Sequence, residues 1–528
     1  MSARAWWQDC VIYQLYPRSF QDSNGDGIGD LRGIIDRVDY LAWLGVGAVW
    51  FSPFFTSPMA DFGYDIANYT DIDPSYGTLA EFDEMVAALH GRGIKVILDF
   101  VPNHTSNRHP WFLDSRSSRK SEKRDWYNWR YPSPGGGPPN NWQSLAGGSS
   151  WEFDGTTGQY YCHTFLKEQV DLNWHNPAVR EAMYEVLRFW LSRSVDGFGL
   201  DAIGCLAKDV QFRDDPPNPD YHEGDPPFAR NRMVHSANGP EIFDIIAEIR
   251  RVVQAKQSRS VLIGEVYLKP GELVPYYGMR LNGLRLPTNL NMLWTPWRPA
   301  AIVDLVEDYE AALPEGAWPN WVLGNHDQSR IATRVGEMQA RAAMMFLLTL
   351  RGTPILYYGD ELGLVDIPIP PEQARDPFGR NMPGMKQGRD PQCCSMPWDE
   401  TPRAGFTAGD PWLPIGTRSP NRSVAAQEQD GASMLSFTRE LIRLRRREPA
   451  LSHGDWAKVE ADGEVLAYAR SLGRKRFVVV LNFEDKPKSV RFADALSGRI
   501  ALSTNARASK PVERNLQLDP NEAVLIAM

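Results

Sequence analysis

Short apolar runs alternate with amphipathic helical patterns along most of this chain, and that alternation limits the fold more than any other feature. Each run is rich in β-branched, aliphatic or aromatic residues, as is typical of strands that are buried on both faces. We predict eight such strands: Val11–Tyr16, Ala48–Phe51, Lys95–Phe100, Gly197–Asp201, Val261–Glu265, Leu290–Leu293, Trp321–His326 and Ile355–Tyr358.

The segments between these runs carry helix signals. Residues Thr78–Glu81 form a capping box, and Asn176–Pro177 supplies an N-cap followed by a proline at the first helical position. Residues 335–350 and 433–447 also follow a helical period. Eight β/α alternations predict an α/β protein with a closed (β/α)8 TIM barrel. An open doubly wound sheet is the alternative, although no glycine-rich phosphate loop follows the first strand.

Two long segments interrupt the alternation, and a third follows it. Residues 102–170 are predicted as a loop-rich inserted domain B after strand three, because a segment of this length is usually functional or partly folded. A second insertion spans about 359–430, after strand eight. The catalytic barrel then comprises 1–101 and 171–454. Short alternating runs over 455–528 predict a C-terminal antiparallel β-domain.

Charge and hydropathy exclude several classes of partner. The 57 Lys and Arg residues against 66 Asp and Glu residues give a net charge of −9, which argues against nucleic-acid binding. No segment has the apolar length of a signal peptide core or a membrane span. The five cysteines are scattered and lack metal-ligand spacing. We therefore predict a cytoplasmic protein, monomeric or homodimeric, that binds neither nucleic acid nor membrane and carries no organic cofactor.

The carboxyl ends of the predicted strands carry acidic residues and histidines. In a barrel, these ends meet at one rim, where active sites lie. Four carboxylates and two histidines are expected there: Asp99, His104, Asp201, Glu265, His326 and Asp327. A single acidic residue at a strand end is usually a helix cap or loop staple, but four at equivalent places favour catalysis. Paired carboxylates without a nucleophilic serine indicate glycosidic chemistry, with one acting as nucleophile and the other as proton donor.

These strand ends resemble the four signature regions of glycoside hydrolase family 13, the α-amylase family. The matching segments are Asp99–His104, Gly197–Asp201, Gly264–Val266 and Asn325–Asp327. Further segments are similar to the oligo-1,6-glucosidase and α-glucosidase branch of that family: Gly63–Ile66, His109–Phe112, Gln169–Trp174 and Gly388–Asp390. The resemblance covers nearly the whole chain.

The resemblance implies roles for individual residues. Asp201 would be the nucleophile, Glu265 the general acid/base, and Asp327 the stabiliser of the transition state. The side chains expected to contact the glucose are His104, His326, Asp65 and Phe165, the last as an apolar wall. An Asp–Arg pair closes the pocket in this branch, and we match it to Asp65 and Arg389. Arg330 is expected to orient the carboxylates.

The predicted activity is that of a retaining, exo-acting α-glucosidase that forms a covalent glucosyl–Asp intermediate and also transfers glucose to hydroxyl acceptors. Ala202, directly after the nucleophile, favours α-1,4 substrates such as maltose. The alternatives are an oligo-1,6-glucosidase, a sucrose or maltose isomerase, and a catalytically impaired saccharide-binding form, such as the amylase-like subunits of amino-acid transporters. A product profile from maltose and sucrose separates hydrolysis from isomerisation.

One departure from the family pattern concerns the nucleophile. The family has an arginine two residues before it, where this chain has Gly199. Residues i and i+2 of a strand point the same way, so that arginine would lie beside Asp201 and lower its pKa. Three explanations are open: another cation such as Arg330 compensates, the chain is impaired, or its role has shifted towards binding or transfer.

Oxygen donors near the N-terminus follow the spacing of a cation-binding loop. Positions 1, 3, 5, 7 and 9 of that loop would be Asp22, Asn24, Asp26, Ile28 through its carbonyl, and Asp30. Gly33 stands at position 12, so the bidentate glutamate of a helix–loop–helix sensor is missing. The family branch carries a structural Ca²⁺ or Mg²⁺ in such a loop, and we expect one here, with an empty Asx-turn loop as the alternative.

Overall fold

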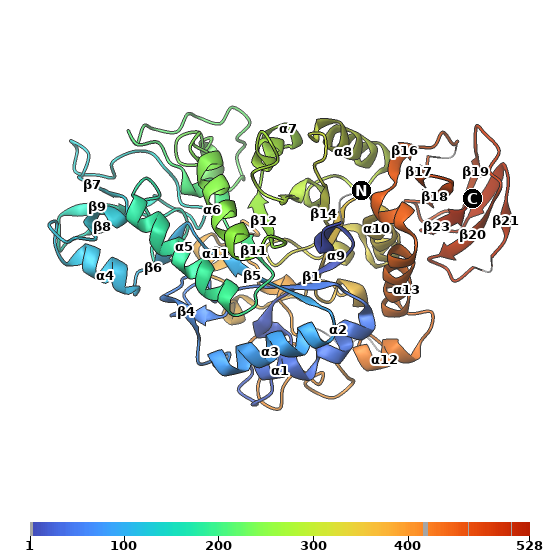
Figure 1. Cartoon of the computed structure of the whole chain (residues 1–528), viewed down its shortest axis with the longest axis horizontal. Helices are drawn as coiled ribbons and strands as arrows, with labels where there is room; N and C mark the ends of the chain where they lie inside the picture. The colour runs from blue at the N-terminus through green and yellow to red at the C-terminus, as the bar shows by residue number, and fades with distance from the viewer. Residues whose placement is uncertain (1–3, 416–420, 463, 508) are drawn as a thin grey trace.

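Eight parallel strands form the centre of the molecule. The computed structural model describes residues 4–415, 421–462, 464–507 and 509–528. In it the strands lie in the order β13-β12-β11-β5-β2-β1-β15-β14. Figure 1 labels β1, β5, β11, β12 and β14 of this sheet near the middle of the molecule. Their bounds are β1 Ile12–Leu15, β2 Ala48–Phe51, β5 Lys95–Phe100, β11 Gly197–Leu200, β12 Val261–Val266, β13 Leu286–Asn289, β14 Asn320–Val322 and β15 Thr353–Tyr357.

A buried side chain completes the circle between the first and last strands of this order. The amide of Asn320 on β14 accepts a hydrogen bond from the backbone N–H of Asn289 at 3.0 Å and donates one to the carbonyl of Pro287, both on β13. The sheet is therefore a nearly closed barrel, as predicted from the alternation, and the open doubly wound sheet is wrong.

Seven of the eight predicted strands are present at or within a few residues of the expected positions. The exception is Leu290–Leu293, which forms a 3₁₀ turn, η7. The sixth strand is instead β13, directly before it. Asn289 explains the change, because its side chain accepts from the N–H of Asn291 and turns the chain as the strand ends.

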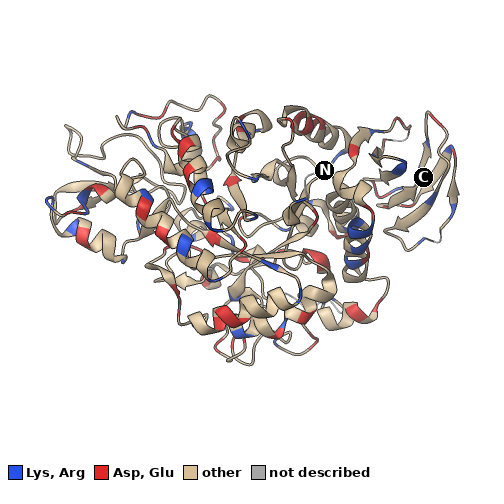
Figure 2. Cartoon of the chain, in the orientation of Figure 1, with Lys and Arg blue, Asp and Glu red and all other residues tan. Residues whose placement is uncertain are grey.

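Helices cover the outside of the barrel and begin where the caps predict. The capping box of Thr78 and Glu81 opens α3, and Asn176 caps α5. The helices of the barrel are α1 Leu31–Asp36, α2 Val38–Leu44, α3 Leu79–Gly91, α5 Pro177–Ser192, α6 Ile242–Lys256, α7 Pro270–Leu273, α8 Pro299–Ala312, α9 Ile331–Val335, α10 Glu337–Thr349, α13 Met434–Arg447 and α14 Pro449–His453. In Figure 2 the last turns of α13 are basic, which suits the dipole at a helix C-terminus.

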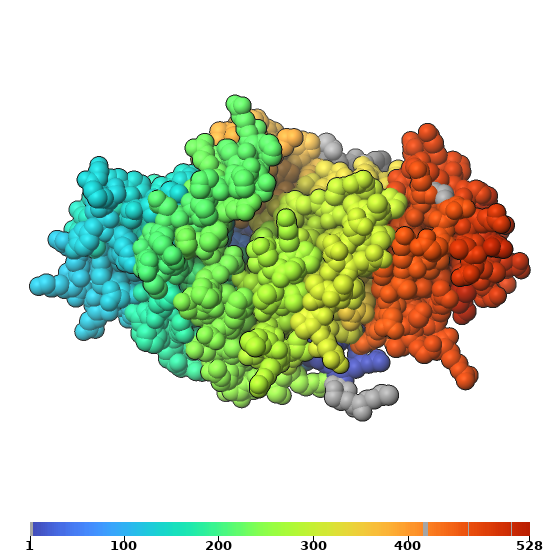
Figure 3. All heavy atoms as spheres, turned by 90° about the horizontal axis from the view of Figure 1, so that it is seen from above, coloured from blue at the N-terminus to red at the C-terminus, as the bar shows by residue number. Residues whose placement is uncertain are grey.

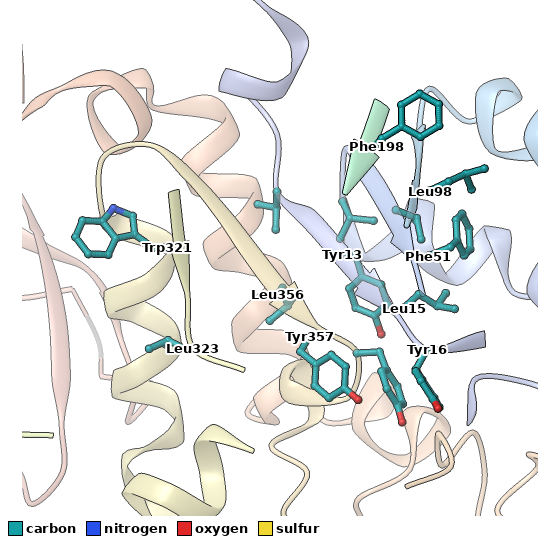
Figure 4. Close-up of a cluster of buried hydrophobic side chains, with 14 of the residues drawn as sticks. Tyr13, Leu15, Tyr16, Phe51, Leu98, Phe198, Trp321, Leu323, Leu356 and Tyr357 are labelled. Atoms are coloured by element: carbon teal, nitrogen blue, oxygen red, sulfur yellow. The ribbon is translucent and has the colours of Figure 1, made fainter. Parts of the chain in front are cut away.

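Successive strand residues alternate between two cores. Figure 4 shows side chains on one side of neighbouring strands, Tyr13, Leu15, Phe51, Leu98 and Phe198, which pack beneath the helices. The other side fills the barrel interior with a separate cluster that includes Ile12, Ala48, Trp50, Ile97, Val261 and Ile263. This interior cluster forms the floor on which the residues at the strand ends rest.

The insertion after β5 is a small, mostly β structure. Its elements are β6 His104–Ser106, α4 Pro110–Ser117, η3 Arg124–Trp126, β7 Trp129–Arg130, β8 Trp151–Asp154, β9 Gln159–Cys162 and β10 Gln169–Asp171. β6 pairs with β10 antiparallel, which brings the two ends of the insertion together beside the barrel. A long segment over 207–241, which sequence reasoning did not single out, follows the nucleophile strand and holds one short 3₁₀ turn, η5 Pro227–Arg230.

The segment after β15 contains short helical turns. They are η8 Asp360–Leu362, η9 Pro371–Gln373, α11 Pro377–Asn381, η10 Asp390–Gln392 and α12 Val424–Gln429. Residues 416–420 of the predicted insertion lie outside the described residues.

The C-terminal part is an antiparallel β structure. Its main sheet has the order β16-β17-β18-β23-β20-β21, and a second sheet pairs β19 with β22. The bounds are β16 Asp455–Lys458, β17 Leu466–Leu472, β18 Lys475–Leu481, β19 Lys488–Arg491, β20 Gly498–Ser503, β21 Pro511–Val512, β22 Asn515–Leu518 and β23 Ala523–Ala527. Figure 3 shows this part, in red, and the first insertion, in cyan, at opposite ends of the molecule with the barrel between them. None of the helices in the described ranges has both the length and the apolar character needed to cross a membrane.

Candidate active site

On three neighbouring strands, the side chains that face the barrel interior are apolar along the strand and acidic at its carboxyl end. On β5, Ile97 is followed two residues later by Asp99; on β12, Ile263 is followed by Glu265. β11 ends at Leu200, and Asp201 is the next residue; it faces the same side as Gly199. Because residues i and i+2 share a face, the carboxylates stand on top of the barrel core and point inward. The acidic group predicted from the sequence is therefore assembled at one rim.

Burial and mutual repulsion shape the protonation of this group. Burial raises the pKa of Asp201, and the charges of Asp99 and Asp327 raise it further. Burial likewise raises the pKa of Glu265, again with Asp201 and Asp327 adding to the effect. The pKa of Asp99 rises to about 7, mainly through burial. Each negative charge in such a closely spaced group disfavours ionisation of the others, which is why the pKa values rise together.

Asp327 behaves differently from its neighbours. Burial acts to raise its pKa, but His326, Arg389 and the hydroxyl of Tyr267 together lower it. One carboxylate oxygen lies 3.7 Å from Nη1 of Arg389, and the other accepts a hydrogen bond of 3.0 Å from Tyr267. Asp327 thus has a lowered pKa, whereas the neighbouring carboxyl groups have raised pKa values.

The two predicted histidines flank the carboxylates as neutral rings. Burial lowers the pKa of His104 to about 4 and also lowers the pKa of His326. His104 packs against Phe165, with ring centroids 5.3 Å apart, so the predicted apolar wall lies beside it. His326 stacks on Tyr64 at 5.3 Å, and its Nε2 lies 2.8 Å from the Tyr64 hydroxyl. The same hydroxyl donates to Asp99 at 2.9 Å.

Arg389 pairs with a different aspartate from the one expected. Its guanidinium forms ion pairs with Asp61 and with Asp376, the latter at 2.6 Å. The predicted partner, Asp65, is fully buried and accepts from Ser57 Oγ at 2.9 Å and from backbone N–H groups of the same loop. Asp65 is therefore a loop staple, and the pairing of Asp65 with Arg389 is wrong. Asp61, four residues earlier, lines the pocket instead.

A small pocket lies between His326 and the ion pairs of Arg389. It is lined by Tyr16, Asp61, Phe62, Tyr64, His326, Asp376, Arg389, Asp390, Cys393 and Trp412. Arg389 and its ion-pair partners Asp61 and Asp376 form one wall of this pocket. The aromatic residues supply flat apolar surfaces of the kind that pack on sugar rings.

Arg330 does not reach the catalytic carboxylates as expected. It is fully buried, donates to the carbonyl of Tyr358 at 2.7 Å and pairs with Asp360 at 3.2 Å. Its guanidinium also lies near the rings of Tyr357 and Tyr358. Arg330 thus holds the loop after β15. Arg389 lowers the pKa of Asp201, but by less than burial and the neighbouring carboxylates raise it.

The position of the missing arginine is filled by an aromatic ring. The indole of Trp50 lies over Gly199, and its Nε1 donates to Asp99 at 3.3 Å. Ala202, the residue after the nucleophile, has φ 48° and ψ 32°, a left-handed conformation that is uncommon for residues other than glycine. Such strain is typical of active-site turns, and here it follows directly on Asp201.

The predicted cation loop is held by its own hydrogen bonds. The carboxylate of Asp22 accepts from the N–H groups of Asn24, Gly25 and Gly27 and from the hydroxyl of Thr407. These four donors occupy the four acceptor sites of one carboxylate. Three more side chains of the loop accept hydrogen bonds. Asn24 accepts from the N–H of Asp26, and Asp26 accepts from the N–H of Ile28. Asp30 accepts from the N–H groups of Ser23 and Gly33 and from the Ser23 hydroxyl. Within the described ranges no group of three or more acidic, His or Cys side chains is arranged to hold a metal. The donor types suit Ca²⁺, but this conformation does not fit it, and the cation stays a prediction.

Sequence reasoning missed five residues of the site, which are Trp50, Asp61, Tyr64, Tyr267 and Asp376. Two signals were available. Asp61 and Tyr64 flank Gly63 in the loop that was matched to the family, and Tyr267 follows Glu265 at the spacing of one strand face. Asp376 is the N-cap of α11 and is followed by Pro377, a local signal for a helix start that does not reveal its ion pair with Arg389.

Comparison with known proteins agrees with this geometry. The Alpha-amylase family (alpha amylase, catalytic domain) matches residues 14–454. A probable alpha-glucosidase of Rhizobium meliloti (strain 1021) is 42% identical over 499 residues, which cover 92% of this chain and 90% of that protein. An oligo-1,6-glucosidase of Parageobacillus thermoglucosidasius is 36% identical over 531 residues, covering 93% and 92%.

The fold is also shared with solved structures. The crystal structure of the alpha-glucosyl transfer enzyme XgtA superposes with a TM-score of 0.94 at 37% identity, and the match covers 99% of this chain and 100% of that one. The similarity thus extends over the barrel, the insertions and the C-terminal β-domain together.

Proposed function

Since the chain belongs to glycoside hydrolase family 13, the α-amylase family, and is a glucosidase of that family, we propose that it is a retaining, exo-acting α-glucosidase. It removes terminal glucose from α-glucosides and transfers part of it to hydroxyl acceptors. The observation that supports this proposal most is the gathering of Asp201, Glu265 and Asp327 beside a pocket walled by Arg389.

The first chemical step uses two of these carboxylates. The carboxylate of Asp201 attacks the anomeric carbon while Glu265 gives its proton to the departing oxygen, which leaves a glucosyl ester on Asp201. The raised pKa of Glu265 suits this donor role, because it favours the protonated form of the carboxyl group. Asp327, with its lowered pKa, supplies a fixed negative charge for the cationic sugar ring that develops.

The second step returns the enzyme to its starting state. Glu265, now a base, takes the proton of a water molecule or another hydroxyl, whose oxygen attacks the anomeric carbon and breaks the ester to Asp201. Two inversions give net retention of the α configuration. Water and alcohols compete for the same intermediate, so hydrolysis and transfer occur together.

The ion pairs of Arg389 support exo action. Arg389 is anchored by Asp61 and Asp376 and approaches Asp327, so one side of the pocket is occupied by fixed charge. A terminal glucose fits against this wall, whereas a continuing chain would have to displace buried ion pairs. We keep the preference for α-1,4 substrates such as maltose, which comes from the small residue Ala202 directly after the nucleophile.

The test is turnover of p-nitrophenyl α-glucoside, with the anomer of the released glucose followed by NMR. We expect α-glucose first, with slow mutarotation afterwards, and no release by Asp201→Asn. Initial release of β-glucose would contradict retention. A folded protein that binds but does not cleave the substrate would favour the saccharide-binding alternative, and an isomeric disaccharide from sucrose or maltose would favour the isomerase.

A further inference from the structure

Residues 376–389, here called the strap, carry part of the pocket wall on a loop that is otherwise largely open to solvent. The strap contains α11, and its last residue is Arg389. Among residues 377–389, all of which the structure describes, only the side chain of Met382 is buried, with an exposed fraction of 5%. Loops with few buried contacts open locally at low cost, so the position of this wall depends on what holds Met382.

The base of the strap binds Arg389 to the start of α11. The carboxylate of Asp376, the N-cap of this helix, accepts hydrogen bonds from the backbone N–H of Arg389 at 3.1 Å and from its Nε at 2.9 Å. Cζ of Arg389 also lies 4.4 Å from the ring centroid of Phe378. The guanidinium is thus carried by the first turn of α11, and its ion pair with Asp61 links it to the loop after β3, Phe55–Thr56.

Met382 attaches the other end of α11 to the insertion after β5. It is the C-cap of this helix, and its N–H donates to the carbonyl of Phe378 at 3.0 Å. Gly147 of the insertion lies so close that a Cβ at residue 147 would be 3.1 Å from Cγ and 3.5 Å from Sδ of Met382. Its φ of 95° is a conformation that favours glycine. The thioether therefore packs on backbone that a side chain would cover.

The turn that carries Gly147 is bonded to the apolar side of the site. The N–H of Gly147 donates to the carbonyl of Ser144 at 3.0 Å, and Oγ of Ser144 donates to the carbonyl of Phe165 at 2.6 Å. Phe165 in turn packs on His104. The contact between Met382 and Gly147 thus joins the charged wall of the pocket to its apolar wall.

We propose that Met382 is a positioning residue whose contact with Gly147 latches the strap and keeps Arg389 in the wall that excludes a chain extending beyond the terminal glucose. This inference rests on the proposed exo action and identifies the residue that maintains it. When the latch opens, Asp376 moves with the strap, so the ion pair that breaks is the one between Arg389 and Asp61. The pocket then admits a longer or capped chain.

The test compares two forms of p-nitrophenyl α-maltotetraoside, with products separated by chromatography. One form has a free non-reducing end, and in the other the terminal 4- and 6-hydroxyls are joined in an ethylidene acetal. In Met382→Ala we expect the ratio of kcat/KM for the blocked form to that for the free form to rise by about 10-fold or more, because more molecules have an open strap. A general loss of structure would lower both values together. Met382→Leu keeps the buried volume and should keep the wild-type ratio.

The other side of the latch offers a matched pair of variants. Gly147→Ala directs a methyl group against the side chain of Met382 and should raise the ratio as Met382→Ala does. Gly148→Ala is the control, because Gly148 has φ 82° in the same turn and a Cβ there meets nothing within 4 Å. Equal effects of the two glycine substitutions would overturn the proposal.

Trypsin digestion under native conditions separates the latch from the proposed function, because it requires no turnover. Arg380 and Lys386 are exposed residues of the strap, and cleavage after them is followed by mass spectrometry. We expect cleavage to be about 10-fold faster in Met382→Ala and Gly147→Ala than in the wild type and Gly148→Ala.

The outcomes of the two assays are distinct. Faster cleavage by trypsin in variants of a protein that hydrolyses neither substrate would support the latch and refute the proposed hydrolysis. Equal cleavage in all variants would overturn the latch. Faster cleavage with an unchanged substrate ratio would also overturn the proposal, since the strap would open without affecting exo action.

Discussion

The indole of Trp50 lies against the bare α-carbon of Gly199, two strands away in the barrel, so that a Cβ at residue 199 would lie 2.4 Å from Cε2 of Trp50. Between them stands Asp99, which is in register with Gly199 and accepts the N–H of the indole. A neutral aromatic donor therefore occupies the space where the family arginine was expected.

Gly199→Ala is expected to disturb this packing. The added methyl group must displace a fully buried ring, which should lower the free energy of unfolding by about 1–3 kcal/mol and reduce kcat as Asp99 loses its donor. Urea denaturation and steady-state kinetics measure the two effects. Gly155→Ala is the control, because a Cβ there meets nothing within 4 Å. A variant as stable and active as the control would show that Trp50 moves freely.

Gly199→Arg is expected to be worse than Gly199→Ala, because the longer side chain needs the volume of the Trp50 indole. Combining it with Trp50→Ala should recover part of the stability. The measurement is the coupling free energy of the double-mutant cycle by denaturation. Additive losses would mean that the two residues do not share one space.

Substitution of Asp61 is expected to affect catalysis, whereas substitution of Asp65 is expected to affect stability. Asp61→Asn breaks an ion pair with Arg389 at the pocket wall, so kcat/KM for maltose should fall by about 10-fold or more. Asp65→Asn weakens a loop staple and should mainly lower the melting temperature. Kinetics and calorimetry on both variants check this. The reverse pattern would restore Asp65 as the partner of the sugar.

Asp201→Asn should abolish turnover and stabilise the fold at alkaline pH. The pKa of Asp201 is raised in the folded state, so its contribution to stability is full below the unfolded pKa and is lost as pH rises through the folded pKa. Removing the charge should therefore raise the melting temperature at about pH 8, and the gain should disappear near pH 4. Thermal denaturation across this range gives the answer. A gain at low pH instead would contradict a raised pKa.

Asp99→Asn should move the acid limb of the pH profile of kcat/KM to lower pH. The charge of Asp99 contributes to the raised pKa of Asp201, and the nucleophile must be ionised to attack. Without Asp99, Asp201 should lose its proton at lower pH. The full pH profile of the variant shows the shift, and an unmoved limb would mean that Asp99 and Asp201 do not interact.

Ca²⁺ should bind the loop around Asp22 only weakly. A cation must compete with the four donors that Asp22 already accepts, so we expect the melting temperature to rise only at about millimolar Ca²⁺, with kcat unchanged. Differential scanning calorimetry with EDTA and with added Ca²⁺ measures this, and Asp26→Asn is the comparison. Loss of kcat in EDTA without loss of stability would indicate a catalytic metal.

Local sequence determined the elements and the chemical character of the rim. Apolar runs predicted seven of eight strands, and caps such as Thr78 marked helix starts, because these signals act within a few residues. Asp99 and Glu265 could be placed at the rim from strand position alone, since parallel strands in a barrel end at the same edge.

Tertiary structure decided which of these residues meet. Asp61 and Asp65 lie four residues apart in one loop, and only the approach of Arg389, more than 300 residues later, separates a pocket wall from a staple. Trp50 reaches Gly199 across the barrel interior, which strand periodicity cannot reveal. The sequence by itself thus determined periodicity, caps and chemistry, which are properties of neighbours in the chain. Which side chains pair and which occupy the same space depend on distances between residues far apart in the chain. The closed barrel fixes those distances.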